Sequence, residues 1–233
     1  AELVADKWNL SREDLDQFAL ESHQKAAQAT ESKYFDREIL PVEGKNAEGI
    51  NDLVMTDEGI RFDASLDKLA GLNPVTEGGV ITAGNASQIT DGAAAVVICN
   101  DAGLKKIQAN PRAEIVSISV VGDDPVFMLT GPIPASKKAL ETANLSIDDM
   151  DLYEVNEAFA PVPLAWAVDL KADKSKLNVN GGAMALGHPL GATGAKLMTT
   201  LLHEMERRES KYGLQAICEG GGTANATIIK RIA

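Results

Sequence analysis

The sequence predicts an α/β fold in which helices flank a mixed β-sheet. Two observations predict it. From about residue 111 onward, short apolar runs with strand character alternate with segments of helical periodicity. The chain then closes with two successive strands, 214–218 and 224–229, joined through a glycine-rich turn. Alternation favours parallel strands with crossover helices, and the closing pair adds antiparallel pairing.

The first third begins with a predicted helix over residues 9–30. Ser11 followed by Asp14 is typical of a capping box at a helix start, and apolar or small residues recur at helical spacing behind it. His23 lies in this helix and is interpreted as a surface or boundary residue. Residues 31–80 are charged and rich in glycine and proline, which predicts an irregular segment with short helices and strands.

The middle of the chain predicts strands at 80–82, 93–98 and 115–121, with a short helix at 101–108. The run at 93–98 is continuously apolar, as expected of a strand that is covered on both faces. Cys99 ends this run and is expected to be a buried small hydrophobe.

In the last half, prolines within 131–134 lead into a helix at 135–142, and Ser146 with Asp149 repeats the capping-box pattern. The remaining predicted elements are a buried strand at 152–155, a helix ending near 170, a strand at 177–180, a helix at 195–207 and the closing strand pair.

Composition excludes several classes of function. The chain has 233 residues, 45% of them hydrophobic, and a net charge of −12, which argues against nucleic acid as a general partner. Two cysteines and three histidines show neither metal-ligand spacing nor a disulfide framework, which favours a reducing cytoplasm and no metal. Neither a membrane-spanning run nor a signal-peptide core is visible. Because the first residue is not Met, we expect further sequence upstream.

Candidate chemistry follows three of the expected strands. Asn156 and Glu157 come after one, His188 lies in the glycine-rich stretch 187–194 after a second, and Cys218 precedes Gly220, Gly221 and Gly222 after a third. Ligands of α/β sheets gather at strand ends. Histidine exchanges protons near neutral pH, cysteine can act as acid, base or nucleophile, and glycine N–H groups can stabilise an oxyanion.

Each feature also has a structural interpretation. A lone histidine in a Gly/Pro loop is more often a turn residue, the cysteine can be core, the asparagine a helix cap, and the glycines a hairpin. The stretch 187–194 fits neither a phosphate loop nor a dinucleotide fingerprint. The case for catalysis is that all three features follow strands in one half of the chain.

These motifs resemble those of thiolases, the acyltransferases that make or cleave 3-ketoacyl-CoA. The matching runs are Asn156-Glu157-Ala158-Phe159, Gly187-His188-Pro189-Leu190-Gly191-Ala192-Thr193-Gly194 and Cys218-Glu219-Gly220-Gly221-Gly222. Supporting matches are Thr82 to Ser87, Asp91 to Ala94 and Gly131 to Ala135. The resemblance implies a thiolase fold, CoA and acyl-CoA as substrates rather than a cofactor, lipid metabolism and a homo-oligomer.

The resemblance also implies roles for individual residues. His188 would deprotonate the nucleophilic cysteine, and Asn156 would hold a water that forms an oxyanion hole with it. Cys218 would move the α-proton of acetyl-CoA, and the N–H of Gly220 would serve a second oxyanion hole. Positions matching the pantetheine channel are Ala83, Ser87, Met128, Ala158 and Phe159. Arg61, and with less support Lys68, match the region that holds the CoA nucleotide.

Two departures from the family pattern shape the expectations. Neither cysteine matches the family's acyl-accepting cysteine, so we expect a C-terminal portion that begins inside the loop domain, after the nucleophile. Its divisions would be the rest of the loop domain at 1–89, a strand and helix completing the N-terminal half at 90–110, and the C-terminal domain at 111–233. Such a chain would be inactive and poorly stable without an N-terminal half, from the same gene or a partner. The alternative is a non-catalytic subunit that binds CoA or supports a partner.

The second departure is Glu219, where many members of the family carry an apolar residue. It resembles a degradative branch of broad specificity that acts on branched or sterol-derived acyl-CoA.

Overall fold

A mixed four-stranded sheet forms the centre of the molecule. The computed structural model describes residues 1–45 and 49–232. The strand order is β3-β6-β5-β4, with bounds β3 (Ala113–Gly122), β4 (Leu152–Val155), β5 (Tyr212–Cys218) and β6 (Thr223–Arg231). β4 pairs parallel with β5, whereas β6 is antiparallel to both β5 and β3. The α/β class and the mixed sheet predicted from the sequence are confirmed.

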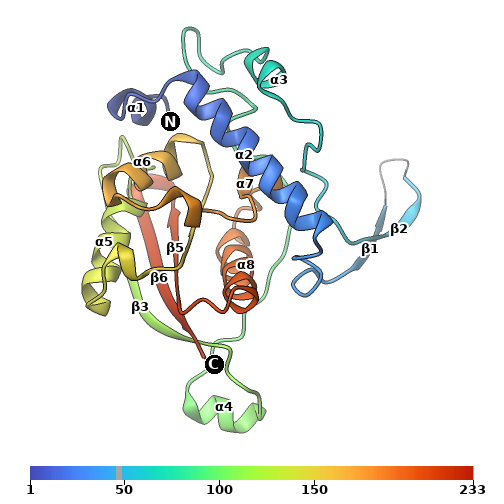
Figure 1. The fold of residues 1–233 in the computed structure, drawn as a ribbon, viewed down its shortest axis with the longest axis vertical. Helices are drawn as coiled ribbons and strands as arrows, with labels where there is room; N and C mark the ends of the chain where they lie inside the picture. The colour runs from blue at the N-terminus through green and yellow to red at the C-terminus, as the bar shows by residue number, and fades with distance from the viewer. Residues whose placement is uncertain (46–48, 233) are drawn as a thin grey trace.

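Helices cover both faces of this sheet. Successive residues of β5 point to opposite faces, so their contacts show which helices lie on each face. Leu214 and Ala216 join the core beneath α5 (Pro132–Ala143) and α6 (Pro161–Leu170). Gly213, which precedes Leu214, points to the opposite face and toward α8 (Thr193–Arg207): a Cβ there would lie 2.5 Å from the Met205 sulfur. In Figure 1, α5 and α6 lie on one side of β5 and β6, with α8 on the other.

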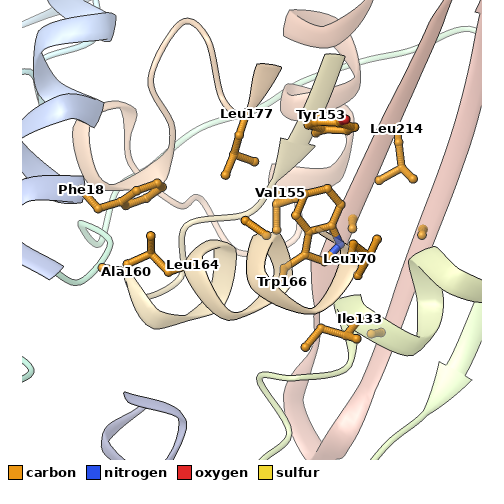
Figure 2. Packing of buried hydrophobic residues seen from close by; sticks show 14 of the residues in the cluster. Phe18, Ile133, Tyr153, Val155, Ala160, Leu164, Trp166, Leu170, Leu177 and Leu214 are labelled. Carbon is orange, nitrogen blue, oxygen red and sulfur yellow. The ribbon is translucent and has the colours of Figure 1, made fainter. Parts of the chain in front are cut away.

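The largest core cluster joins the first and last thirds of the chain. Trp166 is fully buried, donates its indole N–H to Ser136 Oγ at 2.8 Å, and meets the Tyr153 ring edge-on at 5.2 Å. Phe18, on α2 (Arg12–Glu31), and Leu177 pack into the same cluster (Figure 2). Helix α2 is therefore part of the core that supports the sheet.

The remaining elements lie outside the sheet. They are α1 (Glu2–Lys7), β1 (Val42–Lys45), β2 (Asn51–Val54), α3 (Leu66–Ala70), α4 (Asp101–Ile107) and α7 (Ala183–Leu186), with 3₁₀ turns at Ile147–Asp149, Lys174–Lys176 and Gly220–Gly222. Both predicted capping boxes form, at Ser11 with Asp14 and at Ser146 with Asp149. The first helix, α1, was not predicted.

Three predicted strands are wrong. Residues 93–98 form no strand, and each residue from 91 to 100 is exposed, including Cys99. A strand needs a neighbour to receive its backbone hydrogen bonds, and none of the described residues pairs with this run. Residues 80–82 and 177–180 make isolated bridges only, such as Pro74 with Thr82 and Tyr153 with Leu177.

His23 is buried rather than a boundary residue, at 5% exposure. Its Nδ1 accepts a hydrogen bond from the backbone N–H of Arg61 at 3.1 Å, so the ring fixes the irregular segment onto α2. No helix within the described ranges is long and apolar enough to cross a membrane.

Candidate active site

The parallel pairing of β4 and β5 brings Asn156 and Cys218 to one edge of the sheet. Val155 is in register with Ala216, and the backbone N–H of Asn156 donates to the Ala216 carbonyl at 3.0 Å. The chain leaves β4 at Asn156, and β5 ends at Cys218. Two of the three predicted motifs therefore meet at the carboxyl ends of neighbouring parallel strands, where ligands of α/β sheets bind.

The third motif reaches this edge through the turn between α7 and α8. Gly187 ends α7 with φ of +81°, and a Cβ there would lie 2.4 Å from Thr90 side-chain atoms. Glycine is required on both grounds. The backbone N–H of His188 then donates to the Gln88 carbonyl at 3.0 Å. The element before this loop is a helix rather than the expected strand.

Asn156 and His188 are in direct contact. Asn156 Nδ2 lies 3.2 Å from His188 Nε2, while Asn156 Oδ1 is buried without a hydrogen-bond partner among the described residues. Burial, and then the positive charge of Lys196, lower the pKa of His188. The imidazole is consequently neutral at neutral pH, which is the form that accepts a proton.

Cys218 lies in a small apolar cluster. The cluster contains the buried residues Val4, Leu129, Ala158, Val162 and Ala165 and the partly buried Met128 and Phe159. Burial raises the pKa of the Cys218 thiol to about 11, with the carboxylate of Glu219 adding to the effect. At neutral pH this side chain is therefore a protonated thiol that can donate a proton.

The two cysteines should differ sharply in alkylation by iodoacetamide at pH 8. Cys99 is exposed and Cys218 is buried, and alkylation requires an accessible thiolate. We expect Cys99 to react rapidly, and Cys218 to react at a comparable rate only in denaturant, as read by peptide mass spectrometry. A Cys99→Ala variant isolates the slow site. Rapid labelling of Cys218 in that folded variant would contradict its placement in the apolar cluster.

The glycines after Cys218 form an open turn. Nothing lies within 4 Å of a Cβ built on Gly220, and Gly221 and Gly222 have φ of +75° and +86°. The Gly222 carbonyl accepts a 2.6 Å hydrogen bond from the N–H of Asp123, which fixes the far end of the turn. Gly220 is thus exposed beside Cys218, with room for a substrate oxygen.

Residues expected along the pantetheine channel lie around this edge. The N–H of Ser87 donates to the Ala158 carbonyl at 3.0 Å, and Ala86 forms a β-bridge with Phe159. The loop 83–87, which includes the exposed Ala83, therefore runs along the turn after Asn156. Met128, Ala158 and Phe159 belong to the Cys218 cluster.

Arg61 and Lys68, the expected CoA-nucleotide residues, are exposed on the irregular segment. Lys68 pairs with Asp63. The segment is tied to the site through Gln88, whose amide donates to the carbonyls of Gly59 and Met184, each at 2.7 Å. No described contact joins either basic side chain to the site, so their role stays a prediction.

Sequence reasoning missed two supporting residues. The Gln88 carbonyl accepts a hydrogen bond from the backbone N–H of His188, and Thr193 Oγ1 lies 2.6 Å from His188 Nδ1. Thr193 stands five residues after His188, at the first position of α8. The sequence signal that could have indicated Thr193 is a hydroxyl residue at the start of a predicted helix, a few positions after a candidate catalytic histidine.

The fold and the site define an α/β protein with histidine, asparagine and cysteine at one edge of a mixed sheet. A sequence model of the thiolase C-terminal domain matches residues 109–231, and one of the thiolase N-terminal domain matches residues 1–102. The chain belongs to the thiolase family.

Similar curated proteins cover the whole of this chain but are longer. Steroid 3-ketoacyl-CoA thiolase FadA6 of Mycobacterium tuberculosis is 54% identical over 232 residues, which are 100% of this chain and 56% of FadA6. An acetyl-CoA acetyltransferase of Cupriavidus necator is 46% identical, over 99% of this chain and 59% of its own length. The chain thus spans somewhat over half the length of these relatives.

Solved structures agree with these relatives. Human mitochondrial 3-ketoacyl-CoA thiolase in complex with CoA superposes with a TM-score of 0.95 at 45% identity, over 99% of this chain and 57% of the human chain. The acetyl-CoA acetyltransferase of Bacillus anthracis gives 0.94 at 41% identity, over 99% and 59%.

These matches correct one expectation. The sequence was interpreted as a C-terminal portion of a thiolase that lacks the N-terminal nucleophile-cysteine region. That is wrong, because residues 1–102 match the N-terminal domain and residues 109–231 match the C-terminal domain. The interpretation relied on one absent cysteine motif, whereas the domain match rests on about a hundred positions, including α2 with its buried core face.

Proposed function

We propose that this chain supplies the acid/base centre of a thiolase that cleaves or forms 3-ketoacyl-CoA by two-step acyl transfer with CoA. The main support for the proposal is the contact between Asn156 and His188. Asn156 lies at the sheet edge where β5 ends at Cys218. One neutral imidazole and one protonated thiol provide a base and an acid at the same edge.

In the cleavage direction, His188 Nε2 takes the proton of an attacking thiol, and the thiolate adds to the C3 carbonyl of the substrate. The C2–C3 bond then breaks. Cys218 gives its proton to C2, so acetyl-CoA leaves and the acyl group stays on the thiol. In the second step Cys218 takes the proton of the CoA thiol, the CoA thiolate attacks that thioester, and the released thiolate takes back the proton held by His188, which returns the site to its starting state. A water held by Asn156, and the N–H of Gly220, would donate hydrogen bonds to the oxygens that gain charge.

The acyl-accepting thiol is proposed to come from the part of a thiolase that these 233 residues do not span. Cys218 is held in an apolar cluster and serves as the acid. Cys99 is exposed on the unpaired run 91–100. In this proposal neither Cys99 nor Cys218 is the nucleophile.

Bulky 3-ketoacyl-CoA is the proposed substrate class. Support comes from the relative that is named a steroid 3-ketoacyl-CoA thiolase and from Glu219, which stands exposed beside Gly220 and accepts a hydrogen bond from Asn225 at 2.6 Å. The cytoplasm is the proposed compartment; the rat and bovine relatives are named as mitochondrial.

The test uses the polypeptide purified from its natural source, after its intact mass is measured. Thiolysis of a 3-ketoacyl-CoA should yield acetyl-CoA and the shortened acyl-CoA in equal amounts, and His188→Gln should abolish it. CoA binding without turnover would replace the proposal by the alternative, a non-catalytic CoA-binding subunit. Neither binding nor turnover would overturn both.

A further inference from the structure

A second hydrogen bond holds the His188 ring from the side opposite Asn156. His188 Nδ1 lies 2.6 Å from Thr193 Oγ1, and Thr193 is 4% exposed. The same hydroxyl lies 3.0 Å from the Pro189 carbonyl. The proposed mechanism gives Thr193 no role, yet its contact with the histidine is shorter than that of Asn156.

The direction of these bonds follows from counting hydrogens. A hydroxyl has one hydrogen, and the Pro189 carbonyl can only accept. The Pro189 carbonyl also accepts from the backbone N–H groups of Ala192 and Thr193. With the Thr193 hydroxyl hydrogen donated to the same carbonyl, Thr193 meets His188 Nδ1 through a lone pair. Nδ1 must then carry the ring hydrogen, which leaves a lone pair on Nε2. Asn156 Nδ2 donates to that lone pair, so the bonds run in one direction from Asn156 through His188 and Thr193 to Pro189.

We propose that Thr193 is a positioning residue that holds His188 in the Nδ1–H tautomer, with the Nε2 lone pair on the side of the ring where Asn156 lies. The role as a base rests on the proposed function, whereas the tautomer does not. With the proton on Nε2 instead, the ring could not accept a proton at the edge that Asn156 and Cys218 share.

The other orientation of the Asn156 amide gives a distinct result. If Asn156 Oδ1 faced the ring, Nε2–H would donate to it and Nδ1 would accept from Thr193. The Thr193 hydrogen would then no longer reach Pro189. The two arrangements differ in which ring nitrogen carries hydrogen, which ¹⁵N NMR of labelled histidine reads directly.

The other two histidines provide internal references. His23 Nδ1 accepts from the Arg61 N–H at 3.1 Å, so neutral His23 is the Nε2–H tautomer. His203 Nδ1 lies 2.8 Å from the Thr199 carbonyl, so neutral His203 is the Nδ1–H tautomer. At pH 8 we expect the His188 signals to match those of His203 and not those of His23. His188→Asn and His203→Gln variants assign the signals.

Kinetic variants test whether the hydroxyl matters. Thr193→Val keeps the shape and removes the acceptor; we expect the kcat of thiolysis to fall by roughly 10- to 100-fold, part of the about 10²–10⁴ that a positioned base contributes. Thr193→Ser should restore most of it. Thr199→Val is the matched control on α8, because the Thr199 hydroxyl makes the same back bond, to the Ala195 carbonyl at 2.8 Å, while only its backbone carbonyl contacts a histidine; the variant should keep kcat.

A pH profile separates positioning from a structural role. The Thr193 oxygen also favours the protonated ring, so its loss should move the acid limb of kcat/KM to lower pH, while the charge of Lys196, which faces the same ring, is unchanged. An Nε2–H signal for His188, or equal kcat in the Thr193→Val variant and the wild type, would overturn the proposal. Absence of thiolysis in the wild type would overturn the proposed function but leave the NMR test intact, and wild-type NMR decides the tautomer even if Thr193→Val does not fold.

Discussion

Replacing Gly182 with alanine is expected to lower the free energy of unfolding by about 3 kcal/mol, at the upper end of what overpacking a core costs. A Cβ on Gly182 would lie 2.2 Å from Cδ and 2.4 Å from Oε1 of Glu157. The backbone of Gly182 is extended, at φ −150°, so the cost arises from the collision and not from the dihedral angle.

Glu157 cannot move aside cheaply, because it joins four parts of the chain. Its carboxylate accepts from Ser22 Oγ at 2.7 Å, Asn178 Nδ2 at 2.9 Å and the Met184 N–H at 3.2 Å. Ser22 Oγ in turn accepts from the N–H of Gly182 at 3.0 Å. Glu157 is 1% exposed, and burial raises its pKa despite these donors. Displacing it would strand buried donors on α2, α7 and the turn before α7.

Urea unfolding of the 233-residue chain measures this effect. Gly122→Ala is the matched control, because nothing lies within 4 Å of a Cβ there and its φ is not positive; it should unfold with the wild type. Glu157→Asp shortens the offending carboxylate, so the double variant should be more stable than the sum of the two single changes predicts. Additive effects, or a urea midpoint of Gly182→Ala equal to that of the wild type, would show that the Glu157 carboxylate moves aside without cost and would contradict the prediction.

Local patterns predicted several of the helices well. The capping box at Ser11, the prolines before α5 and the periodicity of α8 act within a few residues, so one sequence is enough to show them. The strand predicted at 93–98 failed because strand formation depends on a neighbour, which a local apolar run cannot reveal.

Sequence motifs predicted the main residues of the candidate site. They did not predict the neighbouring residues that hold those side chains in place. The sequence indicated Asn156, His188 and Cys218, and the structure brings their motifs to one edge through strand register. Burial of His23 and the contacts of Gln88 and Thr193 join segments through tertiary packing or turn geometry. Spacing along the chain does not contain that information.

Replacing Cys218 with alanine should separate the two chemical steps in the thiolase polypeptide. Cleavage of the C2–C3 bond needs a proton at C2, and Cys218 is the protonated thiol at the site. Without it we expect thiolysis of 3-ketoacyl-CoA to fall by about 10²–10⁴, the usual contribution of a positioned acid. Exchange of labelled CoA into acyl-CoA uses only thiol attack on a thioester, so it should stay within about tenfold of the wild type, since no carbon acid is involved.

Two companion variants make the separation decisive. His188→Gln removes the base that both steps use, so both rates should fall together. Cys99→Ala changes the exposed thiol and should leave both rates unchanged. Because Cys218 is buried in an apolar cluster, its replacement leaves a small cavity, and thermal unfolding must show a folded variant. A folded Cys218→Ala protein that loses both rates equally would mean that this thiol serves acyl transfer itself, and the assignment of Cys218 as the carbon acid's proton donor would be rejected.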